Sequence, residues 1–112
     1  MSTTSSGREA EQAVADNLVK QGYAILAQNW RTKSCEIDIV AKMNATVYFV
    51  EVKYRAKADW GDGLDAITPK KLAQMQYAAE VWVRDNRWEG EVALMAASVS
   101  GYPLVVDSLF EI

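Results

Sequence analysis

The sequence contains no histidine and only one cysteine, Cys35, among its 112 residues. The absence of histidine excludes acid–base catalysis by imidazole and every histidine-ligated metal site. A single thiol cannot close an internal disulfide, and on its own it does not make a zinc site. Any metal that the chain binds is therefore expected to be a hard cation held by oxygen ligands.

Long apolar runs and an excess of basic residues are also missing. No run of about eighteen apolar residues occurs, so we expect no membrane-spanning helix and no membrane partner. Residues 1–6 lack the basic and then apolar pattern of a signal peptide. We therefore expect a cytoplasmic protein with a disordered tail over residues 1–6. The net charge of −3 argues against a strong, sequence-independent duplex binder, but it leaves room for a local basic patch.

Half of the residues are apolar and 24% are charged, which predicts one packed domain over residues 7–112. Helical spacing predicts two helices, the first capped by Ser5 or Ser6 and the second starting at Thr68-Pro69, and apolar alternation predicts five strands. In chain order these are a helix at 7–21, strands at 23–30 and within 35–55, a helix at 68–86, and strands at 91–99 and 104–110. Residues 31–34 are predicted to form a polar turn, and residues 55–68 a loop. This order predicts an α/β domain in which two main helices flank a mixed β-sheet of about five strands.

The stretch 35–55 holds the most informative pattern, because it reads as two strands joined by a short turn at residues 42–46. Alternation places Asp38 on one face of the first strand, and Glu51 with Lys53 on one face of the second. The opposite face of the first strand is predicted to hold Cys35, Ile37, Ile39 and Ala41. Charges within strands this apolar are costly unless they are paired or hold a metal.

Asp38 and the Glu51-x-Lys53 pair, with 12 residues between the two carboxylates, have the parts of a metal-assisted phosphodiesterase. Two carboxylates can hold Mg²⁺ or Mn²⁺, with a backbone carbonyl and waters as the remaining ligands. Such an ion activates a water for phosphodiester hydrolysis and offsets charge on the phosphate. Lys53 would orient the water or stabilise the transition state. The residues alone leave another interpretation open, namely a structural ion-pair cluster that binds no ligand.

The hairpin also resembles the YraN-like bacterial family, uncharacterised protein family 0102, of the PD-(D/E)xK nuclease superfamily. The resemblance is carried by Glu36-Ile-Asp-Ile-Val40 and by Val47-Tyr-Phe-Val-Glu-Val-Lys-Tyr-Arg55. It extends to Gly22-Tyr23, to Asn29-Trp30-Arg31 and to Gly61. Cys35 departs from it where the family has glycine, and Glu91-Val92-Ala93 stands where the family has Arg-Phe-Asp.

The resemblance implies a restriction-endonuclease-like core in which Asp38, Glu51 and Lys53 are catalytic and the two acids bind the metal. It also implies that Glu11, from the first helix, is an auxiliary catalytic acid. The sequence pattern by itself favours a different interpretation of Glu11, because the residue lies near the edge of the apolar stripe. On that pattern it is a solvated helix carboxylate.

These observations predict a Mg²⁺-dependent endonuclease that acts on DNA rather than RNA, with branched, resolvase-like substrates among those implied by the family. The alternative is a catalytically inactive nuclease-fold module that binds nucleic acid or serves an assembly, and a homodimer fits either function. The predicted phosphate-binding residues are Arg55, Lys57, Lys70 and Lys71. A merely solvated basic surface is the alternative for these four.

The remaining polar and aromatic residues give weaker indications. Trp60 could stack on a base, but we expect it to pack on its own domain. Glu36 is either a second carboxylate beside Asp38 or an ion-pair partner of Lys42. Cys35 is expected to be a small core residue. Core or interface positions are expected for Tyr77, Trp82 and Trp88.

Overall fold

The structure, a computed structural model, describes residues 5–55 and 67–112. The elements are α1 (Ser5–Lys20), β1 (Ala24–Arg31), β2 (Glu36–Met43), β3 (Thr46–Arg55), α2 (Pro69–Asn86), β4 (Glu91–Ser100) and β5 (Val105–Glu111). The strands form one sheet in the order β1-β2-β3-β4-β5. Strands β3 and β4 are parallel, and the other neighbours are antiparallel. The predicted α/β class, the two helices and the mixed five-stranded sheet are confirmed.

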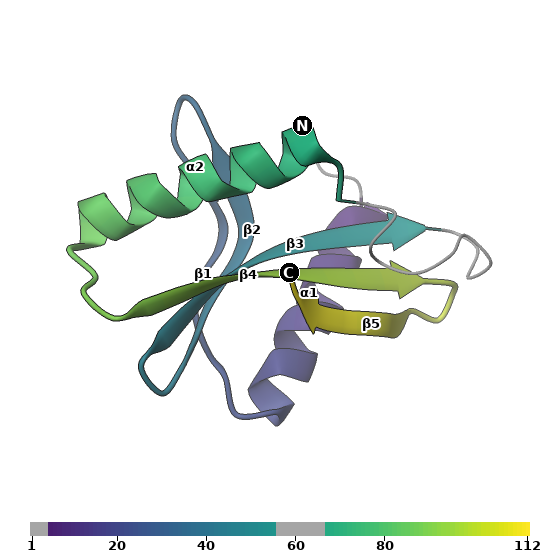
Figure 1. The fold of residues 1–112 in the computed structure, drawn as a ribbon. Helices are drawn as coiled ribbons and strands as arrows, with labels where there is room; N and C mark the ends of the chain where they lie inside the picture. Colours follow the sequence, from purple (N-terminus) through teal and green to yellow (C-terminus); the bar gives the residue numbers. More distant parts are fainter. Residues whose placement is uncertain (1–4, 56–66) are drawn as a thin grey trace.

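The two helices cover opposite faces of the sheet (Figure 1). Helix α1 packs Val14 and Leu18 against one face, in a cluster that includes Ile39 and Val50. Helix α2 packs Trp82 against the other face, where its ring meets Phe49 edge-on at 5.6 Å. In the described ranges, neither helix is long and apolar enough to cross a membrane.

Helix α1 begins two residues earlier than the sequence predicts. Ser5 and Ser6 lie inside the helix, so the expectation that either one caps it, and that both belong to the tail, is wrong. Residues 1–4 of the predicted tail lie outside the described ranges. The earlier start moves Glu9 beyond the first turn, which holds no acidic residue. After the helix, Gly22 adopts a φ of +103°, a left-handed conformation that glycine reaches without strain.

Helix α2 is the crossover that joins the parallel strands β3 and β4, as such a connection requires. Its start follows the predicted pattern, with Thr68 as N-cap and Pro69 in the first turn. The Thr68 hydroxyl accepts a hydrogen bond from the backbone N–H of Lys71 at 3.1 Å. The cap therefore fixes the turn of α2 that carries Lys70 and Lys71.

The regular alternation of faces breaks down in β1 and β2, which corrects one prediction. Ile39 and Ala41 face α1, but Ile37 packs in the α2 cluster, as does Val40. The predicted shared face of Ile37 with Ile39 and Ala41 is therefore wrong. Asn29, which lies on β1 at the level of Asp38, has a left-handed φ of +53° and interrupts the alternation. Asp38 therefore lies at the break in the alternation, between Ile37, which packs on the α2 side of the sheet, and Ile39, which packs on the α1 side.

The capping of α2 can be tested by substitution. Thr68→Ala removes the acceptor for the Lys71 N–H and is expected to lower the free energy of unfolding by about 1 kcal/mol. Thr68→Ser keeps a hydroxyl at the same place and should lose only a small part of that. Denaturant unfolding of the three proteins measures the difference. Equal losses in the alanine and serine variants would contradict a capping role.

Candidate active site

Two carboxylates lie side by side at the point where β2 separates from β3. The antiparallel ladder ends at the Ile39–Val50 pair, and the next residues along the two strands are Asp38 and Glu51. Oδ2 of Asp38 accepts a hydrogen bond from the backbone N–H of Val52 at 2.8 Å. The Asp38 side chain thus continues the bonding between the strands, and its carboxyl group is close enough to Glu51 for each to shift the pKa of the other.

Burial raises the pKa of both carboxyl groups above their ordinary values. For Asp38, burial is the main cause, and the Val52 N–H and the Lys71 ammonium oppose it. For Glu51, burial and then the negative charge of Asp38 raise the pKa to about 7, against the opposing effect of Lys71. Close carboxylates resist double ionisation, so this pair holds a shared proton up to near-neutral pH.

Lys71 reaches the pair from α2. Its Nζ lies 3.3 Å from Oε2 of Glu51, and both side chains are largely shielded from solvent. The sequence predicts Lys71 as a phosphate contact on the rim of the site, whereas in the structure it forms an ion pair with one of the two acids. A partly buried ion pair of this kind keeps part of the negative charge compensated.

Glu11 approaches from the α1 side and is only 9% exposed. The expectation of a solvated helix carboxylate is therefore wrong, because α1 turns this residue toward the sheet. Its Oε1 is buried and has no hydrogen-bond partner. Burial and then the charge of Asp38 raise its pKa, while a hydrogen bond with the Asn29 side chain lowers it. Because α1 and α2 lie on opposite faces, Asp38 interacts with a residue from each of them.

The other predicted site residues are placed less closely. Lys53 is exposed, and its ammonium makes no ion pair or hydrogen bond with the part of the chain that the structure describes. Arg55 is half-buried at the end of β3, and Lys70 is exposed on the first turn of α2. Lys57 and Trp60 lie outside the described ranges. The structure thus brings together Glu11, Asp38, Glu51 and Lys71, and leaves Lys53 without a contact to them.

A divalent ion at this place would have few side-chain ligands. Within residues 5–55 and 67–112, no three side chains of the acidic, cysteine or histidine types form a group that could hold a metal. Asp38 and Glu51 are the adjacent pair. Mg²⁺ commonly takes only one or two protein carboxylates and keeps several waters, so a two-carboxylate site is compatible with this ion.

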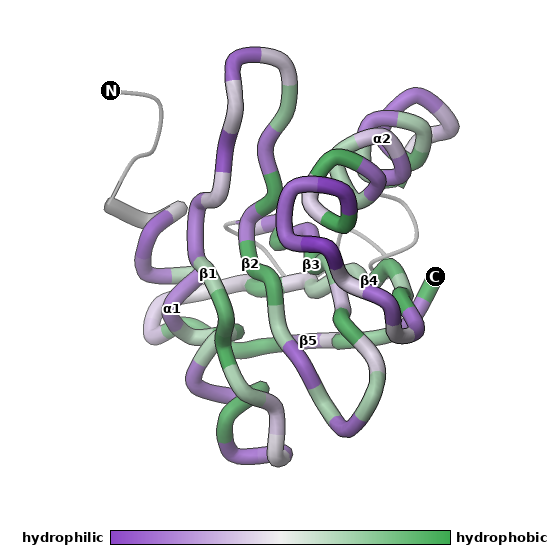
Figure 2. The backbone as a smooth tube through the Cα atoms, turned by 90° about the vertical axis from the view of Figure 1, so that its left-hand side faces the viewer, coloured by the Kyte–Doolittle hydropathy of each residue, from purple (hydrophilic) through white to green (hydrophobic). Residues whose placement is uncertain are grey.

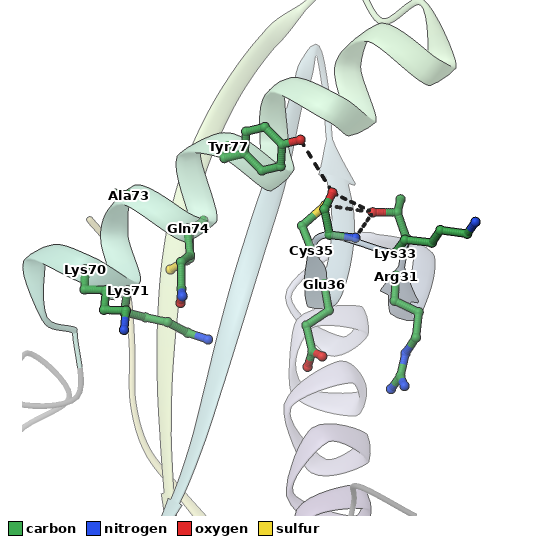
Figure 3. A pocket seen from close by; sticks show the side chains of 12 residues that line it. Arg31, Lys33, Cys35, Glu36, Lys70, Lys71, Ala73, Gln74 and Tyr77 are labelled. Carbon is green, nitrogen blue, oxygen red and sulfur yellow. Dashed lines mark hydrogen bonds between the residues drawn. The ribbon is translucent and has the colours of Figure 1, made fainter.

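Beside the carboxylates lies a groove of about 750 Å³ between α2 and the β1–β2 turn (Figure 3). We call it the basic groove. It is lined by Arg31, Thr32, Lys33, Ser34, Cys35, Glu36, Lys70, Lys71, Ala73, Gln74, Met75 and Tyr77. The sequence predicts residues 31–34 only as a polar turn, so the contribution of Arg31 and Lys33 was missed. Two cations next to the hairpin that carries Asp38 were the available signal.

Three smaller predictions can be compared with the groove. Tyr77 is 50% exposed at the groove wall, which contradicts a core position, while the predicted alternative of an interface position stays a prediction. Cys35 is partly buried against the α2 cluster, in agreement with its predicted packing role. Glu36 is exposed and lines the groove. No described ion pair joins it to Lys42, whose ammonium lies 5.9 Å from the centre of the Trp88 ring.

The raised pKa of Glu51 predicts a pH-dependent stability. A folded-state pKa of about 7, above the ordinary 4.5, means that the folded chain binds the extra proton between these values. The free energy of unfolding should therefore fall as pH rises through this window, by up to about 3 kcal/mol, since one pKa unit corresponds to about 1.4 kcal/mol.

Glu51→Gln should make this decrease smaller, whereas Glu80→Gln, on the exposed side of α2, should leave it unchanged. Urea unfolding at pH values from about 4.5 to 8 measures the slope. A wild-type stability that rises over this range, or an equal slope in Glu51→Gln, would contradict the assigned shift.

The chain matches the family described as "Uncharacterised protein family UPF0102" over residues 10–102. A UPF0102 protein of Pseudomonas fluorescens strain Pf0-1 is 42% identical over 84 residues, which cover 74% of this chain and 70% of that relative. One of Leifsonia xyli is 42% identical over 78 residues, covering 70% of this chain and 66% of the relative. One of Pseudomonas putida strain GB-1 is 36% identical over 110 residues, covering 92% and 89%. The chain therefore belongs to the UPF0102 family, and the resemblance that its hairpin sequence indicated is confirmed.

Proposed function

We propose that this protein is a divalent-cation-dependent endonuclease that hydrolyses phosphodiester bonds in DNA. The observation that carries the proposal is the half-buried Asp38–Glu51 pair at the end of the β2–β3 ladder. Two adjacent carboxyl groups with raised pKa values are unfavourable by themselves, and a divalent cation would replace the shared proton with a stronger counter-charge.

Asp38 and Glu51 are the residues that would hold Mg²⁺ or Mn²⁺. When bound, the ion supplies a Lewis acid that offsets phosphate charge and lowers the pKa of water. The hydrogen bond from Val52 fixes the Asp38 carboxylate in position, which reduces the cost of organising the site when substrate arrives. The ion pair with Lys71 holds Glu51 in the same way.

Two further side chains complete the proposed chemistry. Lys53 lies two residues after Glu51 on β3, and its exposed ammonium is available to a phosphate oxygen or to the attacking water. Glu11 lies within electrostatic range of Asp38 and has an unpaired buried oxygen. This oxygen can accept a hydrogen bond from water during the reaction. Lys53 would thus act through the positive charge of its ammonium, and Glu11 through the hydrogen bond that its Oε1 accepts.

A second function is favoured by a different observation. The Lys71 ammonium already compensates Glu51, and no three-ligand group occurs in the described parts of the chain. Both facts suit a nuclease-fold module that binds nucleic acid without cleaving it. Metal binding discriminates between the two functions, since the module requires no ion.

The cleavage test uses single-stranded, duplex and four-way DNA with Mg²⁺ or Mn²⁺. Asp38→Asn and Glu51→Gln should each lower the cleavage rate by at least about 100-fold, the size typical of losing one charge-stabilising group. Asparagine at position 38 keeps an oxygen that can accept the Val52 N–H, so it disturbs folding less than alanine.

Glu80→Gln is the matched control, because it removes one exposed carboxylate from α2 without touching the site. Calorimetry with Mn²⁺ provides a reading that is independent of cleavage, and heat of binding should vanish in Asp38→Asn. Cleavage at the wild-type rate in both site variants would refute the proposed enzyme. Absence of Mn²⁺ binding in the wild type would favour the non-catalytic module.

A further inference from the structure

The basic groove has a charge opposite to that of the whole protein. Four of its lining side chains are cationic, namely Arg31, Lys33, Lys70 and Lys71, and one, Glu36, is acidic. The complete chain carries a net charge of −3. Such a concentration of positive charge attracts a polyanion to this place rather than to the molecule as a whole.

The side chains approach the groove from both walls. In Figure 3, Lys71 extends from α2 toward the side on which Glu36 lies, while Arg31 points downward beyond Glu36 and Lys33 points outward from the turn. Arg31 is also close enough to Glu11 to lower its pKa. A chain of phosphates in the groove would therefore meet cations along its length and arrive at the carboxylates through Lys71, which contacts Glu51.

Tyr77 adds a feature that a simple anion site does not need. Its side chain is 50% exposed on the groove wall, and the face of an aromatic ring is a platform for a nucleic-acid base. Positive charge together with an accessible aromatic ring is the usual composition of a site for single-stranded nucleic acid.

A contact between the two walls argues against a duplex inside the groove. The hydroxyl groups of Tyr77 and Ser34 lie 3.5 Å apart and connect the two walls at one end (Figure 3). The β1–β2 turn, which carries one wall, projects past the sheet beside α2, which carries the other (Figure 2). A DNA duplex, whose major groove alone is about 12 Å wide, is too broad to lie between walls joined by such a contact.

We infer that the basic groove binds a single-stranded segment of DNA and guides it toward Asp38 and Glu51. Tyr77 stacks on a base, and Arg31 and Lys70 contact the backbone phosphates. The direction toward the carboxylates depends on the proposed nuclease function, whereas binding in the groove does not. The substrate class is then DNA with an unpaired end, flap or branch.

The test measures binding without cleavage. Fluorescence anisotropy with a labelled oligothymidylate of about 12 nucleotides, within the usual site size, is recorded in EDTA. We expect tighter binding of this strand than of a blunt duplex of equal length. We also expect it to bind more tightly than the matching oligouridylate. Inorganic polyphosphate at the same phosphate concentration should compete poorly.

Variants locate the binding. Tyr77→Ala should weaken binding by about 5- to 100-fold, the effect of losing one stacked base, and Tyr77→Phe should retain it. Arg31→Ala should make the slope of log affinity against log salt less negative by about 0.7, the effect of one lost phosphate contact on a single strand. Lys20→Ala, in the last turn of α1 on the opposite face of the sheet, is the charge control and should bind as wild type.

The inference is overturned if the duplex binds as tightly as the single strand, if RNA is preferred, or if polyphosphate competes equally well. It is also overturned if Tyr77→Ala binds as wild type. Because divalent ions are absent, the two proposals fail separately. Retained single-strand binding without any cleavage in Mg²⁺ refutes only the nuclease. Cleavage without single-strand preference refutes only the role of the basic groove.

Discussion

The site depends on the partial burial of two carboxyl groups beside each other where β2 leaves β3. Placing a pair of acids in an apolar sheet is costly, and each neighbouring group offsets part of the cost. The Val52 N–H bonds to Asp38, the Lys71 ammonium pairs with Glu51, and the raised pKa of Glu51 favours its neutral form up to near-neutral pH. The end of the β-ladder makes this possible, because it frees a backbone donor just where Asp38 needs one.

Each helix brings one further charged group to this pair. Helix α1 supplies Glu11 from one side of the sheet, and α2 supplies Lys71 from the other. Both groups interact electrostatically with Asp38. They can do so from opposite faces because the alternation of β1 and β2 is interrupted at Asn29 and Asp38. The irregular strand is therefore part of the site, since a regular one would turn Asp38 wholly toward one helix.

Most of the fold could be predicted from sequence, because helix caps, apolar periodicity and turn residues are local signals. Thr68-Pro69 marked the start of α2 correctly, and the hairpin placed Asp38 beside Glu51. The burial of Glu11 could not be predicted from periodicity, since it depends on how α1 lies on the sheet. The reversed face of Ile37 was missed for a related reason, namely that a left-handed residue on another strand interrupts the alternation.

Helix α2 is connected to the hairpin only through the crossover between β3 and β4. The acids that would do chemistry lie on the hairpin, while Lys70, Gln74 and Tyr77 of the groove lie on a helix outside it. The α2 wall of the groove and the Asp38–Glu51 pair are thus encoded in separate blocks of the gene, whereas the other wall, at residues 31–36, adjoins the hairpin. During evolution, the outer surface of α2 could diversify among relatives and alter which polymers are chosen, while the reactive centre stayed constant.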